Sequence, residues 1–362
     1  MDKFIPKYKQ ISDDLARKIR NKTYLYGDTI PTEYELATEY DVSRYTIRKA
    51  LSILDEDGYI KGQKGSGTYV TYEFDESQIE ERLRNKTIGI ITTHISEYIF
   101  PSIIRGIEDT LKKYNATLLL SSTDNDHNIE RKSIISMMEK NVDGLIIEPT
   151  KSNHYNPNLT YYHKLRQEKI PYIMIHADYG LIDSNQVLFD DEKAGYDATM
   201  ELIKNGHRRI ATIIKYDDKQ GKYRLKGYLK ALEEAEIFLK DSIYIYGTHE
   251  EKKAVEDFFE DFEEGRFSAV FCYNDQIASY VLKKLSEKDL QMPWDLSITS
   301  IDNSIISQNL GISSVNHPKS DLGIKAAEWI MKSILNQDFK NQSYTFPGDL
   351  VIRGSVREMS KD

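Results

Sequence analysis

The sequence predicts a small α+β domain at the amino-terminal end, followed by a larger α/β unit with parallel sheets. Near the start of the chain, three amphipathic helical segments come in quick succession, and two short strands rich in glycine turns follow them. From Lys86 onward, short apolar runs alternate with amphipathic stretches, which is the pattern of repeated βαβ units. At 362 residues the chain is long enough for two or three compact units.

Residues 1–72 contain the elements of the small domain. The segment "TEYE" at 32–35 has the form of a capping box, which starts a second helix after the first. The inward positions that helical spacing predicts in these two helices are Ile11, Leu15, Ile19, Leu36, Ala37 and Tyr40. A short turn then makes Ser43 the N-cap of a third helix. Two helices joined by so tight a turn predict a helix-turn-helix, whose second helix lies in the major groove of DNA.

The third helix, "SRYTIRKALSIL" at 43–54, has one apolar face and one basic face. Its inward positions, at helical spacing, are Ile47, Ala50, Leu51 and Leu54. The positions left on the outside are Arg44, Tyr45, Arg48 and Lys49. A basic helix face alone is more often a solvated surface. Here it coincides with the second helix of a helix-turn-helix, so we expect DNA binding.

The segment "GYIKGQKGSGTYVTY" at 58–72 predicts a β-hairpin beside these helices. Gly62, Gly65 and Gly67 interrupt it, and the residues after Gly67 alternate as a strand. A basic, glycine-rich tip can approach a phosphate backbone or enter the minor groove. The predicted small domain is therefore a winged helix.

Charge divides the chain in the same way. Residues 1–70 carry 12 basic and 11 acidic side chains, whereas the remainder carries 37 and 47, within a formal net charge of -9. The excess of acidic side chains therefore lies outside the predicted DNA-binding domain. We expect this acidic region to repel the phosphate backbone, so that only the local basic face attracts DNA. The single cysteine, Cys272, lies in an apolar run and excludes an intramolecular disulfide; we expect it to be buried and inert.

The small domain resembles the amino-terminal domain of GntR-type bacterial regulators. The family pattern is met by Pro31, Glu33, Leu36, Ala37, Val42, Ser43, Arg44, Thr46, Arg48, Ala50, Leu51, Leu54, Gly58, Gly65, Gly67 and Val70. This resemblance implies binding to double-stranded operator DNA. The DNA-binding residues that we expect are Lys7, Thr32, Glu33, Ser43, Arg44, Tyr45, Thr46, Arg48, Lys49, Gln63, Lys64 and Gly65. Lys7, ahead of the first helix, is expected to contact the DNA backbone.

Residues 73–85 are charged and carry few apolar side chains, so we expect a linker there, either a flexible tether or a short helix. Residues 86–362 are many for one sheet, which predicts two lobes. In open parallel sheets a ligand lies beyond the carboxyl ends of the strands. Polar residues follow the predicted strands at these ends, and a single one is more often a helix cap. Together, carboxylates, amides and aromatic rings suit a small polyhydroxylated ligand.

This second region resembles the effector domains of LacI/GalR-type repressors, which have a periplasmic-binding-protein-like fold of two lobes joined by three crossovers. The resemblance rests on segments such as "DGLIIEPT", "LFDDEKAGYDATMELIKNGHRRIA", "CYNDQIA" and "SSVNHP". It implies crossovers near 178–186, 303–312 and 336–343. Arg224 matches the family arginine that binds a pair of ligand hydroxyls, and Asn274, Asp275 and Asp302 match its amide and carboxylate ligands.

The pairing of the two domains is that of the bacterial arabinose-operon repressors, and "ITTHISEYIFPSIIRGIE" and "HPKSDLGIKAA" are similar to that family. The resemblance implies a repressor that responds to L-arabinose. For its mechanism we expect a homodimer, formed through the large domains, that leaves its operator when the sugar binds. The effector-binding residues that we expect are Tyr98, Phe100, Glu148, His176, Asp191, Lys215, Arg224, Asn274, Asp275 and Asp302. No cofactor or metal is expected. A different sugar or a sugar phosphate remains an alternative effector.

Two other classes of protein are weighed against this interpretation. A sugar-binding transport protein would share the large domain but would need a secretion signal, and the amino terminus lacks an apolar signal-peptide core. An enzyme is disfavoured because the chain has no G-x-S-x-G, no P-loop and no His/Cys metal spacing, and "EDFFEDFEEG" lacks the spacing of a calcium loop. No stretch approaches the ~20 apolar residues of a membrane span. We expect a cytoplasmic, nucleoid-associated protein without catalytic residues.

Overall fold

The computed structural model describes residues 6–20, 23–63, 66–72, 83–95, 98–263, 265–336 and 339–359. It separates into two compact units, residues 1–80 and residues 81–362. We call them the DNA-binding unit and the large unit. Most of the predicted linker lies outside the described residues, but Leu83 near its end is fully buried.

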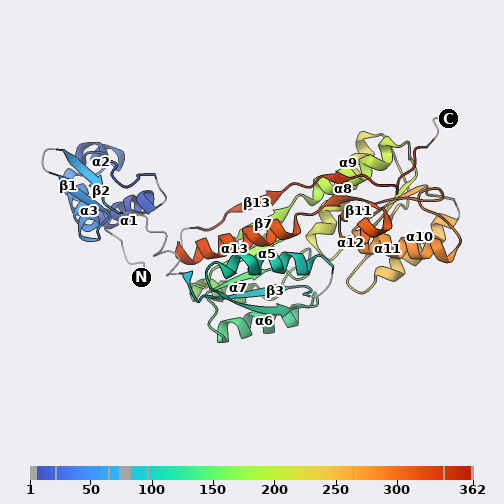
Figure 1. Ribbon diagram of the computed structural model, residues 1–362, viewed down its shortest axis with the longest axis horizontal. Helices are drawn as coiled ribbons and strands as arrows, with labels where there is room; N and C mark the ends of the chain where they lie inside the picture. The colour runs from blue at the N-terminus through green and yellow to red at the C-terminus, as the bar shows by residue number, and fades with distance from the viewer. Residues whose placement is uncertain are drawn as a thin grey trace. The chain divides into compact units, whose positions relative to one another are not determined.

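In its described residues, the DNA-binding unit has three helices and a two-stranded hairpin (Figure 1). The elements are α1 (Lys7–Arg20), α2 (Glu33–Glu39), α3 (Arg44–Glu56), β1 (Ile60–Gln63) and β2 (Gly67–Val70). The two strands are antiparallel and pair in register from Ile60 with Val70 to Gln63 with Gly67. This order is the predicted winged helix-turn-helix.

The two caps predicted from the sequence start the second and third helices. The Glu35 N–H donates to Thr32 Oγ1, and the Thr32 N–H donates in return to Glu35 Oε2 at 2.8 Å, which completes the capping box. At the start of α3 the Thr46 N–H donates to Ser43 Oγ. The buried positions of α1, α2 and α3 include Ile11, Leu15, Ile19, Leu36, Ile47, Ala50 and Leu54. The predicted inward faces therefore form the core of this unit.

The large unit has two lobes, each built on a six-stranded sheet. In lobe 1 the strands run parallel in the order β13-β7-β6-β5-β3-β4. Their bounds are β3 (Thr87–Thr92), β4 (Thr117–Ser122), β5 (Gly144–Ile147), β6 (Tyr172–Ile175), β7 (Asn185–Phe189) and β13 (Ser343–Phe346). The helices of this lobe are α5 (Phe100–Lys112), α6 (His127–Glu139), α7 (Leu159–Gln167) and α13 (Lys319–Leu335).

In lobe 2 the order is β14-β12-β11-β10-β8-β9, and the edge strand β14 is antiparallel to β12. The strand bounds are β8 (Ile210–Lys215), β9 (Ile243–Tyr246), β10 (Ala269–Cys272), β11 (Ser297–Asp302), β12 (Ser313–Asn316) and β14 (Leu350–Val351). The helices are α8 (Asp191–Lys204), α9 (Lys219–Glu234), α10 (Glu251–Glu263), α11 (Asp275–Glu287) and α12 (Ile305–Leu310). The predicted α/β architecture with two lobes is confirmed.

The three crossovers between the lobes lie later in the chain than the sequence predicted. They follow β7 at residue 190, β12 at 317–318 and β13 at 347–349. The predicted positions, 178–186, 303–312 and 336–343, were wrong because the chain does not yet change lobe there. The chain first continues into β7, β12 and β13, respectively, and each of these strands belongs to the sheet of the lobe that the chain is about to leave. The strand beside a crossover therefore belongs to the lobe that the chain is leaving.

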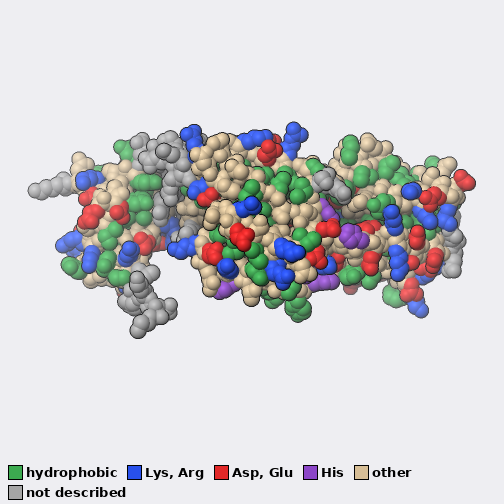
Figure 2. Space-filling view, turned by 90° about the horizontal axis from the view of Figure 1, so that it is seen from below, with side chains coloured by type: hydrophobic (Ala, Val, Ile, Leu, Met, Phe, Trp, Pro, Cys, Tyr) green, Lys and Arg blue, Asp and Glu red, His purple; other side chains and the backbone are tan. Residues whose placement is uncertain are grey.

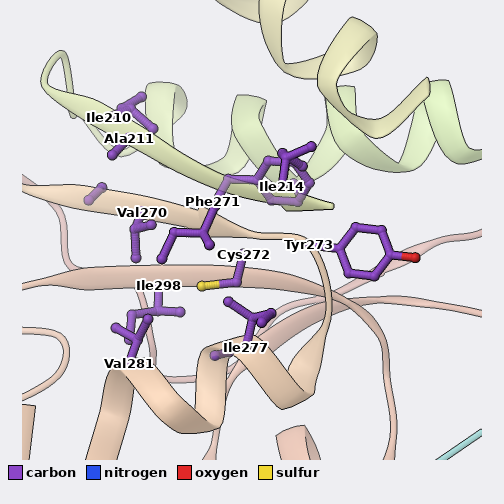
Figure 3. Packing of buried hydrophobic residues seen from close by; sticks show 14 of the residues in the cluster. Ile210, Ala211, Ile214, Val270, Phe271, Cys272, Tyr273, Ile277, Val281 and Ile298 are labelled. Atoms are coloured by element: carbon purple, nitrogen blue, oxygen red, sulfur yellow. The ribbon is translucent and has the colours of Figure 1, made fainter. Parts of the chain in front are cut away.

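Each lobe is held together by a core of aliphatic and aromatic side chains. Figure 3 shows part of the lobe 2 core, where Cys272 of β10 lies among side chains of β11 and α11. The cysteine is fully buried, and burial raises the pKa of its thiol far above the ordinary value. This confirms the predicted buried position, and a raised pKa disfavours the reactive thiolate.

Glycines allow helices α5 and α13 to approach closely in lobe 1. A Cβ at Gly323 would lie 2.2 Å from the carbonyl oxygen of Ile103. We therefore expect Gly323→Ala to lower the free energy of unfolding of the large unit by about 1–3 kcal/mol, because the helices must separate. Urea-induced unfolding followed by circular dichroism measures this loss. Gly354→Ala is the control, because its added Cβ meets nothing within 4 Å; equal midpoints for both variants would contradict the prediction.

We expect His207 to make the stability of the large unit depend on pH. The ring is buried, with Nδ1 2.9 Å from Ser268 Oγ and Nε2 3.2 Å from the Arg357 carbonyl oxygen. Burial lowers the pKa of His207 from 6.5 to about 4. The unfolded chain thus binds more protons than the folded protein between these values, so stability falls as pH falls through this window.

We expect His207→Gln to make this acid loss shallower by at most about 1.4 kcal/mol per pH unit. Urea-induced unfolding between pH 7 and pH 4.5 gives the two slopes. Parallel slopes for the variant and the parent protein would show that His207 is not the titrating group.

Candidate functional sites

The outer face of α3 presents the basic side chains that the sequence placed there. The side chains of Arg44 and Arg48 are 62% and 66% exposed, and Tyr45 is 75% exposed. Ile47 and Ala50 of the same helix are fully buried. The predicted division of α3 into a core face and a basic face is confirmed.

Glu33 on α2 holds the Arg48 guanidinium in a two-point contact. Arg48 Nε donates to Glu33 Oε1 at 3.2 Å, and Arg48 Nη2 donates to Oε2 at 3.0 Å. The hydrogen bonds from Arg48, helped by Arg44, lower the pKa of Glu33. The contact links the two helices of the helix-turn-helix and orients Arg48 outward.

The other expected DNA-binding residues lie at helix starts, on the outer face of α3 and at the end of the first hairpin strand, or fall outside the described residues. Thr32 and Ser43 are N-caps, and Thr46 Oγ1 lies 2.9 Å from Ser43 Oγ. Lys49 Nζ lies over the Tyr8 ring, 4.0 Å from its centroid. Lys7 is the first residue of α1 rather than a residue ahead of it, because the helix begins directly after Pro6. Gln63 ends β1 and is exposed, whereas Lys64 and Gly65 lie outside the described residues.

A cavity of about 440 Å³ lies in the large unit and is lined from both lobes. Figure 2 shows histidine and acidic side chains next to one another where the two lobes meet. Nine of the ten expected effector-binding residues line the cavity: Tyr98, Phe100, Glu148, His176, Asp191, Lys215, Arg224, Asn274 and Asp302. The carboxyl ends of the parallel strands bring them together, as the topology requires.

Asp275 is the exception, because it does not line the cavity. It is the first residue of α11 and is fully buried. Its Oδ1 accepts hydrogen bonds from the hydroxyls of Ser300 and Ser314, at 2.5 and 2.6 Å, and its Oδ2 accepts from the Ser304 N–H at 2.6 Å. Asp275 therefore ties together strands β11 and β12 beneath the cavity.

On the lobe 1 side, Glu148 fixes the orientation of His176. Glu148 Oε2 accepts hydrogen bonds from the N–H and the hydroxyl of Thr93, both at 2.7 Å, and its Oε1 lies 3.0 Å from His176 Nδ1. Burial alone would raise the pKa of Glu148, but these hydrogen bonds outweigh it and lower the pKa. Because a charged Glu148 can only accept, His176 Nδ1 is the donor in this hydrogen bond, and Nε2 is left for other partners.

On the lobe 2 side, Arg224 is the central charge. Its Nε donates to Asp191 Oδ1 at 2.8 Å, its Nη1 donates to the Tyr273 carbonyl oxygen at 2.7 Å, and its Nη2 lies 3.6 Å from Asp302 Oδ1. Burial alone would lower the pKa of Arg224, but the two carboxylates outweigh it and raise the pKa. Arg224 therefore stays charged and rigidly placed.

Several buried polar atoms of the cavity lining have no hydrogen-bond partner among the described residues: His176 Nε2, Gln220 Oε1, Asp302 Oδ1 and His317 Nδ1. Burial, together with the nearby His176 and Lys319, lowers the pKa of His317 well below its ordinary value, so its ring is neutral. A neutral imidazole can donate from one nitrogen and accept at the other. Buried polar groups without partners are costly, so this lining favours a ligand rich in hydroxyl groups.

Six described residues of the cavity lining, among them Tyr98, His176 and Asp302, have positive φ angles, which residues other than glycine rarely adopt. The φ angles are 61° at Tyr98, 65° at His176 and 103° at Asp302. Such strained positions are held by surrounding structure and cluster at functional sites. The Tyr98 hydroxyl donates to Asp302 Oδ2 at 2.6 Å and accepts from the Asp275 N–H. Tyr98 of lobe 1 therefore holds one oxygen of the Asp302 carboxylate of lobe 2, and the other oxygen, Asp302 Oδ1, lies near Arg224.

The sequence interpretation missed several cavity residues. His317 follows β12 directly and Tyr273 follows β10 directly, so the rule of polar strand ends could have found both. Asp218 and Gln220 begin α9 after β8. Their signal was the position of Asp218 as the N-cap of that helix, which carries Arg224.

Two absences are noted for the described part of the chain. There, no group of His, Cys, Asp or Glu side chains is arranged to hold a metal ion. Of the helices described, none is long and apolar enough to cross a membrane.

Comparisons with known proteins match both units. Residues 7–70 match the family of bacterial regulatory proteins called gntR, and residues 199–356 match the periplasmic binding protein-like domain. An arabinose metabolism transcriptional repressor of Geobacillus stearothermophilus is 36% identical over 99% of this chain and 100% of its own length. One of the same name from Halalkalibacterium halodurans is 36% identical over 98% of each chain.

Solved structures resemble the large unit. The transcription regulator CcpA of Lactococcus lactis aligns with a TM-score of 0.67 at 26% identity, over 76% of this chain and 100% of its own. A LacI family transcriptional regulator from Enterococcus faecium, solved with bound ribose, aligns with a TM-score of 0.65 at 24% identity over the same shares. The likeness to the second structure concerns the fold.

Proposed function

The chain belongs to the family of arabinose metabolism transcriptional repressors, and from this premise we propose that it binds operator DNA through its first unit and leaves it when L-arabinose enters the cavity. The observation that carries the effector assignment is the set of unpartnered buried polar atoms around the charged Arg224. A small sugar offers both donors and acceptors to such a lining. The protein acts as a regulator and not as a catalyst.

The charges of the cavity favour a neutral sugar over a sugar phosphate. Its two lysine or arginine side chains in the described lining, Lys215 and Arg224, are each paired with carboxylates. Lys215 Nζ lies 3.2 Å from both Asp217 Oδ1 and Asp218 Oδ2. A phosphate would have to compete with these carboxylates for a cation, and it would also face the negative charge of Glu148.

Release from DNA requires that the sugar bind one arrangement of the protein better than another. We propose a homodimer, formed through the large units, that spaces two α3 helices for half-sites in successive major grooves. Sugar stabilises the closed arrangement of the lobes, which changes the dimer and weakens DNA binding. A coupling of about 1–3 kcal/mol is typical for such linked sites. The repressor acts in the cytoplasm, where its operator lies.

The test is fluorescence anisotropy of a labelled arabinose-operon promoter fragment at fixed salt. We expect tight binding that L-arabinose reverses, with galactose, xylose, ribose and a pentose phosphate as comparison ligands. Binding that no sugar reverses would retain the DNA-binding unit and overturn the effector assignment. Absence of sequence-specific binding would overturn the proposed function itself.

A further inference from the structure

A group of side chains joins the two lobes beside the cavity without lining it. Lys219 Nζ of lobe 2 lies 2.8 Å from Asp178 Oδ1 of lobe 1, and the Lys219 N–H donates to Ser152 Oγ at 2.9 Å. Nearby, Asn153 Nδ2 donates to the Tyr216 carbonyl oxygen at 2.9 Å. We call these five residues the inter-lobe clasp. None of them belongs to the described cavity lining.

Three of the five clasp residues, Ser152, Asp178 and Lys219, are largely shielded from solvent. Ser152 is 3% exposed, and the side chains of Lys219 and Asp178 are 18% and 21% exposed. Ion pairs on open surfaces contribute little because water and salt screen them, whereas a half-buried, hydrogen-bonded pair is screened less. The contacts can therefore influence how readily the lobes separate.

The clasp acts on the helix that carries the central charge of the cavity. Lys219 is the first residue of α9, and Arg224 lies on the same helix. Ser152 accepts one of the N–H groups that a helix leaves without a partner at its start. A Cβ at Gly221 would lie 1.9 Å from the Lys215 carbonyl oxygen, so this end of α9 also packs tightly on the end of β8. A lobe 1 hydroxyl thus fixes the start of a lobe 2 helix.

We propose that Ser152, Asp178 and Lys219 are positioning residues that set effector affinity by stabilising the closed arrangement of the lobes, without touching the effector. The proposal rests on the proposed function for the identity of the ligand. When only a fraction of molecules has the competent arrangement, the apparent affinity falls by that fraction. Loss of one clasp contact shifts this fraction while the cavity keeps its chemistry.

The first test measures L-arabinose binding by isothermal titration calorimetry on the full chain. We expect Lys219→Met and Ser152→Ala each to raise the dissociation constant about three- to tenfold, the effect of one lost hydrogen bond or pair. Lys219→Arg, which keeps the charge, should retain most of the affinity. Lys226→Met is the matched control, because Lys226 is on the same helix but pairs with Glu192 within lobe 2 at 2.6 Å.

The second test measures lobe separation without sugar. Spin labels on cysteines introduced at the exposed Lys140 of lobe 1 and Lys283 of lobe 2 report the distance by electron paramagnetic resonance. We expect longer or broader distances in Lys219→Met than in the parent protein or Lys226→Met. If neither the parent protein nor any variant binds sugar, the proposed function fails. The measured distances alone then test the proposed role of the inter-lobe clasp. Unchanged distances in Lys219→Met would overturn the proposed role of the inter-lobe clasp, whatever the sugar affinity of this variant.

Discussion

Arg224→Met is expected to weaken L-arabinose binding about a hundredfold or more while operator binding persists, so the variant represses without release. The guanidinium is fixed by Asp191 and the Tyr273 carbonyl oxygen, and its Nη2 lies near the unpartnered Asp302 Oδ1. Each hydrogen bond from a buried charged group to a ligand contributes about 1.5–3 kcal/mol, and a planar guanidinium makes two. Calorimetry measures the sugar affinity, and anisotropy measures the operator affinity.

The stability of this variant has to be separated from its function. Removing Arg224 leaves the buried carboxylate of Asp191 without its cation, and breaking a buried pair in this way lowers stability by about 3–5 kcal/mol. Arg224→Met combined with Asp191→Asn removes that buried charge and should restore folding but not sugar binding. Arg224→Lys should give intermediate affinity, because lysine lacks the planar fork. Parent-like sugar affinity in the double variant would contradict the central role of Arg224.

The elements of the DNA-binding unit could be predicted because their signals are local. The capping box at Thr32 and Glu35, the N-cap at Ser43 and the apolar spacing of α3 each depend on residues within one or two turns. The contact of Arg48 with Glu33 joins two residues that are fifteen positions apart and lie on different helices, so the sequence pattern did not show it.

The cavity could be predicted in outline for a different reason. In a parallel sheet every strand ends at the same edge, so polar residues after strands converge without knowledge of the loops. The rule fails for Asp275, which follows β10 but turns toward Ser300 and Ser314 of the neighbouring strands. Whether a carboxylate after a strand meets a ligand or a hydroxyl of the fold depends on those neighbours, and sequence order does not give them.

The crossovers and the inter-lobe clasp depend on contacts between distant segments. The placement of β13 beside β7 pairs residues more than 150 positions apart, and this pairing moves the last crossover to 347–349. Lys219 and Asp178 are likewise ordinary surface residue types in the sequence. Their pairing follows from the closed arrangement of two lobes, which no local pattern records.

Arg48→Ala is expected to weaken operator binding by about 1–3 kcal/mol while leaving sugar affinity unchanged. Arg48 is exposed on the outer face of α3, and Glu33 holds its guanidinium in an outward orientation. A guanidinium presented in this way can donate two hydrogen bonds to a guanine edge in the major groove. Anisotropy with the promoter fragment, and calorimetry with L-arabinose, give the two affinities for each variant.

The pattern of the loss identifies what Arg48 contacts. If it contacts a base, single base-pair changes in the operator should weaken the parent protein at one position and leave Arg48→Ala indifferent there. If it contacts a phosphate, the loss should be uniform across sequences and the salt slope should decrease by about 1. Lys283→Ala, an exposed lysine of the large unit, is the control for a mere change in net charge. An equal fall in sugar affinity for Arg48→Ala would contradict the separation of the two sites.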